Sequence, residues 1–150
     1  MLMDELTSDL VLCRAHADGW QGAIRLAGGL LERAGACDST YTESMIASVE
    51  KFGPYMVLEE GIAMPHAQAA GNVSRPAICV VTLVDPVPFG HEEFDPVGVL
   101  IGICAPDPTA HLASLTELSQ MFDDEDAVEK LLACESAEAV LDVMGSFFSA

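Results

Sequence analysis

The sequence predicts a single layered α/β domain that spans residues 1–150. Two long apolar runs, Ala77–Val84 and Val97–Cys104, are typical of strands that are covered on both faces of a sheet. Segments with apolar residues at helical spacing precede and follow these runs, and such alternation is typical of the α/β class. With 150 residues, of which 51% are apolar, the chain is long enough to bury one sizeable core.

The boundaries of the expected elements come from capping residues, glycines and prolines. In the first half they are a strand over residues 10–13, a helix from the N-cap Asp18 to near Gly35, and a helix that follows Ser39–Thr40 and stops before Gly53–Pro54. The adjacent Gly28 and Gly29 weaken the first helix by roughly 1 kcal/mol each relative to alanine, unless close packing requires them.

The second half is expected to alternate short strands and turns before it becomes helical. The expected segments are β-prone residues 55–58, a turn into residues 62–64, a turn-rich connection over Asp85–Gly90, a helix capped by Asp107 or Thr109 with Leu112, Leu115 and Leu118 on its apolar face, a short helix over 127–134, and a last helix capped by Ser136.

The charge balance excludes several classes of partner. Six Lys and Arg residues face 24 Asp and Glu residues, for a net charge of −18. Such a chain repels nucleic acids and anionic membrane surfaces, while it can attract a basic protein. No apolar run is long enough to span a membrane, and the N-terminus lacks the features of a signal peptide, so we expect a cytoplasmic protein.

The five cysteines do not predict a disulfide framework or a metal site. They are scattered, odd in number and without a C-x-x-C pair. Cys79 and Cys104 lie inside apolar runs and are expected to be buried as small hydrophobic residues. We expect neither a metal nor another cofactor.

The stretch Gly61–Ala67 contains the strongest candidate for a functional side chain, His66. Pro65 has a fixed φ and stiffens the chain just before the imidazole, and Gly61 permits a tight turn ahead of the run. A neutral imidazole is nucleophilic near pH 7. The residues alone are also compatible with a structural or merely exposed histidine.

Gly-Ile-Ala-Met-Pro-His-Ala, residues 61–67, resembles the active-site motif of the enzyme IIA (EIIA) phosphocarriers of the bacterial sugar phosphotransferase system (PTS), in the mannitol/fructose superfamily. Phe89–Val97 resembles a Gly-His element of that family and, with Tyr55–Leu58, indicates the ascorbate-type branch. Asp107–Leu112 is similar to the family's second histidine site, which points to His111. The resemblance covers nearly the whole chain and implies a type 2 EIIA fold, a mixed β-sheet flanked by helices on both faces.

The resemblance also implies a function. His66 would accept a phosphoryl group from the phosphorylated carrier protein HPr and pass it to an enzyme IIB, with a cysteine as the acceptor, for uptake of a sugar or ascorbate. His111, near the first turn of a helix, would donate a hydrogen bond to the phosphoryl oxygens. The mannitol branch has an arginine on the preceding helix, where this chain offers Lys51. Either Lys51 replaces it, or the branch relies on backbone groups and His111.

Two other functions remain open at this point: a nitrogen-type regulatory EIIA module that is not coupled to transport, and an α/β protein that binds a small molecule. Ile62, Met64 and Ala67 are expected to contribute to an apolar docking patch around His66. Phe147–Phe148 can pack on the core or on a second subunit, so a homo-oligomer is possible.

Overall fold

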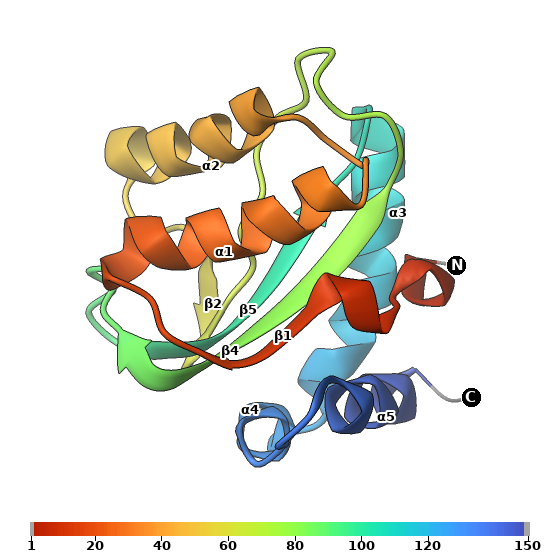
Figure 1. Ribbon diagram of the computed structural model, residues 1–150. Coiled ribbons are helices and arrows are strands. Elements are labelled where there is room, and N and C mark those ends of the chain that lie inside the picture. Colours follow the sequence, from red (N-terminus) through yellow and green to blue (C-terminus); the bar gives the residue numbers. More distant parts are fainter. Residues whose placement is uncertain (1, 149–150) are drawn as a thin grey trace.

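A computed structural model describes residues 2–148, which form one mixed β-sheet with helices against it (Figure 1). The strand order is β1-β4-β5-β3-β2. β1 pairs with β4 and β3 pairs with β5 in parallel, whereas β4–β5 and β2–β3 are antiparallel. The strands are β1 (Val11–Ala15), β2 (Val57–Glu59), β3 (Ile62–Ala63), β4 (Ala77–Val87) and β5 (Val97–Cys104). The mixed sheet implied by the resemblance is confirmed.

Helices cover the sheet from two sides. Figure 1 shows α1 across one face with α2 beside it, while α3, α4 and α5 lie on the other side. The α-helices are α1 (Gly19–Arg33), α2 (Ser39–Phe52), α3 (Pro108–Leu118), α4 (Ala127–Leu132) and α5 (Ala137–Phe147). Short 3-10 helices cover Leu2–Glu5, Ser8–Leu10 and Ser119–Asp123.

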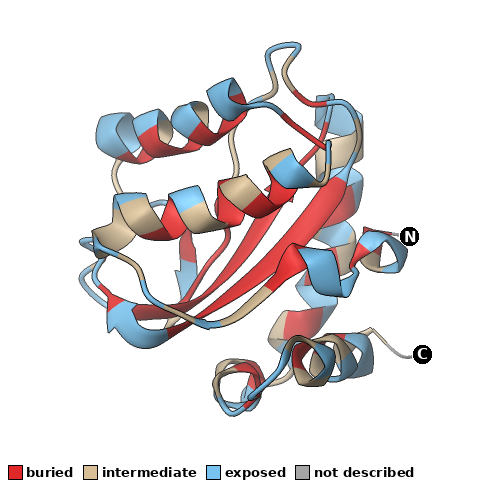
Figure 2. Cartoon of the chain, in the orientation of Figure 1, coloured by how far each residue is buried: buried red, intermediate tan, exposed pale blue. Residues whose placement is uncertain are grey.

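The two central strands, β4 and β5, form the core of the domain. Every residue of β5 is buried, as are the first seven of β4, and Figure 2 shows this buried band between the helical layers. A nearly continuous apolar run is therefore what these two strands need. α1 packs closely on β5, because a Cβ at Gly102 would lie 3.2 Å from the Cβ of Ala27.

Close packing explains one of the two glycines in α1. A Cβ at Gly28 would lie 2.3 Å from Oγ1 of Thr42, so α2 can approach α1 only because no side chain is present there. A Cβ at Gly29 would meet only the flexible guanidinium of Arg33, at 3.3 Å. The packing requirement therefore applies to Gly28 alone.

The structure corrects several predicted boundaries. β4 continues through Pro86 to Val87 where we expected a turn, because Val87 pairs with Val97 beyond a register shift that accommodates the proline. Leu112 is 66% exposed rather than part of an inward apolar face. α4 ends at Leu132 instead of continuing to residue 134.

The capping predictions have mixed outcomes. Asp107 caps α3 and Ser136 caps α5, each by accepting a hydrogen bond from a backbone N–H group. Asp18 precedes α1 but makes no capping hydrogen bond through its side chain, and α2 is capped by Asp38. Phe147 and Phe148 are partly buried against the core.

Both edges of the sheet are short or irregular. β2, at one edge, has three residues and ends in Glu59. β1, at the other edge, is interrupted by a register shift between Leu12 and Ala15, where Arg14 has a φ of 56°.

Candidate functional site

The parallel pairing of β3 with β5 brings the two candidate histidines together. Ile62 pairs with Val99 and Ala63 with Leu100, so both strands end at the same edge of the sheet. The segment after β3 contains His66, and the loop after β5 leads into α3, which contains His111. The centroids of the two imidazole rings are 5.3 Å apart. This edge is where α/β sheets commonly place their sites.

Backbone hydrogen bonds hold the segment that precedes His66. Gly61 has a φ of 81°, which favours glycine, and its carbonyl accepts hydrogen bonds from the N–H groups of Gly98 and Val99. Farther along, the N–H of Met64 donates to the carbonyl of Met56, at 2.8 Å, and the carbonyl of Pro65 accepts from Ile103, at 3.0 Å. The segment is thus fastened to the strands on both sides.

The imidazole of His66 is held in one tautomer. Its Nδ1 lies 2.7 Å from the carbonyl oxygen of Met64. A carbonyl oxygen only accepts hydrogen bonds, so Nδ1 carries the proton and donates it. In the neutral ring Nε2 then keeps its lone pair and is the nucleophilic nitrogen. Tyr55 supports the ring from one side, with its centroid 5.4 Å away in an edge-on arrangement.

Tyr41 connects the two segments that carry the histidines, although nothing in the sequence singled it out. Its side chain is fully buried on α2. The hydroxyl accepts a hydrogen bond from the N–H of Ala67, at 3.0 Å, and donates one to the carbonyl of Ile103, at 2.8 Å. Burial raises the pKa of this hydroxyl well above its usual range, so it stays protonated. A buried tyrosine needs such partners, but its sequence position does not reveal them.

A hollow of about 580 Å³ opens beside the two histidines. Its apolar wall includes Phe52, Tyr55, Pro106 and Pro108, and its polar wall includes Ser48, Gln68 and Asp107. The hollow has the size of a ligand or side-chain pocket.

The expected docking patch has a different composition in the structure. Ile62 and Met64 are only 1% and 2% exposed, because both belong to the buried strand segment, so they contribute no surface. Ala67 is half-buried and does line the hollow. The exposed apolar surface here comes instead from Phe52, at 67% exposure, and Tyr55.

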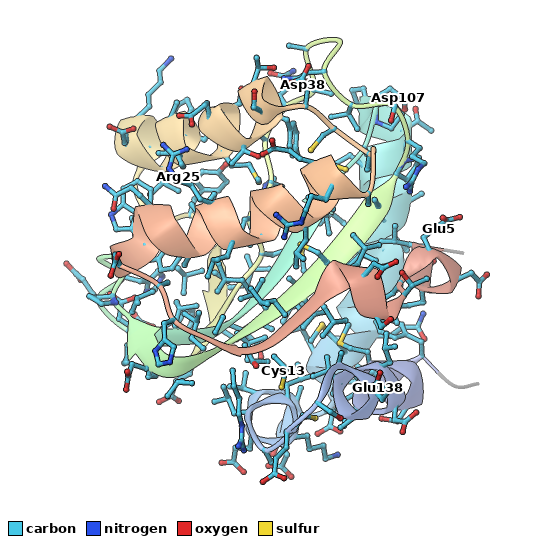
Figure 3. All side chains as sticks on the ribbon, in the orientation of Figure 1. Glu5, Cys13, Arg25, Asp38, Asp107 and Glu138 are labelled. Carbon is cyan, nitrogen blue, oxygen red and sulfur yellow. The ribbon has the colours of Figure 1, made fainter. Side chains whose placement is uncertain are left out.

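His111 lies in the first turn of α3, at the end of the helix that Asp107 marks in Figure 3. Most backbone N–H groups of this turn are not available to bind an anion. Pro108 has no N–H group. The N–H of Ala110 donates to the Asp107 carboxylate at 2.8 Å, and the N–H of His111 donates to the Asp107 carbonyl at 3.0 Å. The imidazole of His111 is therefore better placed than these backbone N–H groups to donate a hydrogen bond to an anion at this end of the helix.

The pKa of His111 is lowered from its ordinary value. Burial is the main cause, and the neighbouring His66 adds to it because two positive charges so close would repel. A lowered pKa keeps His111 neutral at pH 7. A neutral imidazole has one N–H donor and one acceptor nitrogen.

No lysine or arginine is among the described residues that line the hollow. Lys51 is exposed, with its Nζ 5.1 Å from the centroid of the Phe52 ring. Arg33 lines a separate hollow. The other cationic side chains form ion pairs elsewhere: Arg14 with Glu135, Arg25 with Glu43, Arg75 with Glu5, and Lys130 with Asp124.

The remaining histidines lie outside the site. His91 has a structural role, because its Nδ1 accepts hydrogen bonds from the N–H groups of Glu93 and Phe94. His16 is exposed. Within residues 2–148, no three His, Cys, Asp or Glu side chains are grouped to hold a metal ion. Over the same residues, no helix is long and apolar enough to cross a membrane.

Comparison with known proteins identifies a family. A family model described as "phosphoenolpyruvate-dependent sugar phosphotransferase system, EIIA 2" matches residues 5–146. The ascorbate-specific PTS system EIIA component of Salmonella typhimurium (strain LT2) is 34% identical over 145 residues, which are 95% of this chain and 94% of the relative. The motif around His66 is therefore part of a likeness that runs through the whole domain, and the hypothesis of an unrelated ligand-binding protein is wrong.

Solved structures agree with this result. A Streptococcus pyogenes M1 GAS protein, solved as a candidate PTS IIA domain, superposes with a TM-score of 0.90 at 36% identity and covers 100% of this chain and 99% of that one. The mannitol enzyme IIA of Escherichia coli, in complex with its phosphorylated enzyme IIB, superposes with a TM-score of 0.83 at 29% identity, covering 94% of this chain and 97% of that one.

Proposed function

This chain belongs to the EIIA 2 family of the phosphoenolpyruvate-dependent sugar phosphotransferase system, and on that premise we propose that His66 is the residue that carries the phosphoryl group. As an EIIA component, the protein is a phosphotransferase whose partner is an enzyme IIB. The observation that carries the proposal is the contact of Nδ1 of His66 with the carbonyl of Met64, at 2.7 Å. It leaves Nε2 as the nucleophile in a rigid segment beside an open hollow.

The reaction needs little covalent chemistry from the protein. The lone pair of Nε2 attacks the phosphorus of the donor, which we propose is the phosphohistidine of HPr. A bond forms between Nε2 and phosphorus, the bond between phosphorus and the donor nitrogen breaks, and its electron pair stays on the donor. Positioning and charge stabilisation dominate such transfers, and both are properties of the fold around His66.

His111 supports the phosphoryl group in this proposal. Its ring lies beside that of His66, and its N–H donates to a phosphoryl oxygen. Ser48 and Gln68 on the wall of the hollow add neutral donors. Lys51 is not part of this wall, so the site relies on His111 rather than on a substitute for the arginine of the mannitol branch.

The onward acceptor is an enzyme IIB, and we propose that it accepts the group on a cysteine and serves the uptake of ascorbate. Relatives that are named ascorbate-specific EIIA components support this assignment. The net charge of −18 is suited to attract basic partner surfaces to this protein over long range. Such an exchange between soluble carriers takes place in the cytoplasm.

Intact-mass measurements with phosphoenolpyruvate, enzyme I and HPr test the proposal. Wild type should gain one phosphoryl group, and His66→Gln should gain none. His16→Gln, which alters an exposed histidine outside the site, should behave like wild type. A phosphoryl group that persists on His66→Gln would overturn the assignment. Addition of an ascorbate-type IIB should discharge the phosphorylated protein, whereas a regulatory EIIA module would stay charged.

A further inference from the structure

The wall of the hollow has no permanent positive charge to match a phosphoryl group. Of the described cationic side chains, Arg14, Arg25, Arg75 and Lys130 form ion pairs elsewhere and Arg33 lines a separate hollow. Lys51 is exposed over the ring of Phe52 and does not itself line the hollow. The capping carboxylate of Asp107, in the polar wall, is negative. A phosphorylated His66 would therefore add anionic charge to a chain that already has a net charge of −18.

The added charge can be counted from the chemistry. Transfer adds PO₃⁻ to a neutral imidazole. While Nδ1 keeps its proton, which the carbonyl of Met64 favours, the ring becomes cationic and the three phosphoryl oxygens carry close to two negative charges. The net addition is one negative charge, concentrated on oxygens beside largely apolar walls. An unpaired charge in such surroundings is costly, so the site gains if a proton accompanies the group.

We propose that phosphorylation of His66 is coupled to the uptake of one proton by His111, so that the site gains PO₃⁻ and H⁺ together and releases both on transfer to the acceptor. This inference rests on the proposed function of His66. It assigns His111 a change of protonation in each cycle, beyond the donation of a hydrogen bond.

The surroundings of His111 favour this change. The titratable groups that share the hollow with it are His66, Tyr55 and Asp107. Before transfer, burial and His66 both hold the pKa of His111 down, so the ring is neutral. After transfer, the phosphoryl oxygens are bonded through phosphorus to a ring whose centroid lies 5.3 Å from that of His111, and a negative charge at this range favours the imidazolium.

The balance of the cycle is complete with a proton from water. On charging, the bond from Nε2 to phosphorus forms and His111 binds one proton. On discharge, that bond breaks, its electron pair returns to Nε2, the phosphoryl group passes to the nucleophile of IIB, and His111 releases its proton. Low pH therefore favours the charged form of the protein, and high pH favours discharge.

Two measurements test the coupling. The first is an NMR titration of the His111 ring in the unphosphorylated protein and in the protein charged with phosphoenolpyruvate, enzyme I and HPr, with the signal assigned by its loss in His111→Gln. We expect the midpoint for His111 to move upward by about one pH unit or more on charging. The second is the equilibrium between phospho-HPr and this protein as a function of pH.

Comparison of variants removes the donor's own pH dependence from the second measurement. Glutamine keeps an N–H donor but binds no proton, so the ratio of wild-type to His111→Gln equilibrium constants should fall up to about tenfold per pH unit between the two midpoints. His16→Gln should keep the wild-type profile. Equal midpoints in the two states, or equal profiles for wild type and His111→Gln, would overturn the coupling. Failure of wild type to be charged on His66 would instead overturn the proposed function.

Discussion

Replacing Tyr41 with phenylalanine removes one hydroxyl and leaves the ring in its buried position on α2. The hydroxyl bridges the N–H of Ala67 and the carbonyl of Ile103, at 3.0 and 2.8 Å. Each bond contributes about 1 kcal/mol, and the group left without a partner adds a desolvation cost, so Tyr41→Phe should lower the free energy of unfolding by about 2 to 3 kcal/mol. In a domain of this size, about 2 kcal/mol corresponds to a fall in Tm of about 4 to 8 °C.

Urea unfolding measures the first quantity, and Tyr55→Phe is the matched control. The Tyr55 hydroxyl donates to the carbonyl of His66 at 3.3 Å from an exposed position, so its loss should cost about 0.5 kcal/mol or less. Tyr41→Phe should also slow charging of His66 by HPr, since Ala67 is the next residue. Equal stability of Tyr41→Phe and wild type, or an unchanged rate of charging, would contradict the positioning role of this hydroxyl.

Three further perturbations have defined outcomes. Gly28→Ala should lower the free energy of unfolding in urea by about 1 to 3 kcal/mol, because the new Cβ would clash with Thr42. Gly29→Ala should be neutral or stabilising by up to about 1 kcal/mol, and equal effects of the two substitutions would argue against the close packing of α1 on α2. Folding lowers the pKa of His111, so as pH falls below about 6.5 the His111 ring binds a proton in the unfolded chain before it does so in the folded one. Wild type should therefore lose more stability than His111→Gln between pH 7 and 5, as measured by urea titrations. Phe52→Ala should leave stability nearly unchanged and raise the concentration of HPr needed for half-maximal charging by about fivefold or more; an unchanged value would exclude Phe52 from the docking surface.

Continuous apolar patterning predicted the core strands well, and it failed where tertiary pairing overrides local signals. The run Val97–Cys104 has the same bounds in sequence and structure, because every residue is apolar and prolines flank it. Asp85 and Pro86 indicate a turn locally, yet β4 continues past them because Val87 finds Val97 on the neighbouring strand. No local pattern contains that information.

The site could be predicted only in part for the same reason. The motif pointed to His66, but its proximity to His111 depends on the pairing of β3 with β5, and β3 has only two residues. The resemblance to a family supplied that relation, whereas periodicity did not. Ile62 and Met64 belong to the motif and were expected at the surface, but the short strand β3 and the residue that follows it are buried inside the layered fold. Tyr41 remained hidden because its partners are distant in sequence.

The irregular edges of the sheet have a consequence for how this protein behaves in a crowded cell. A long, regular edge strand exposes unpaired N–H and C=O groups, to which a second copy can add its own edge and start aggregation. Here β2 has only three residues and ends in Glu59. In β1, the backbone of Arg14 is in the left-handed region and the pairing with β4 shifts register there. Neither edge is a template for a further strand. A carrier that must bind and release successive partners is thereby protected against edge-to-edge strand pairing with a neighbouring protein.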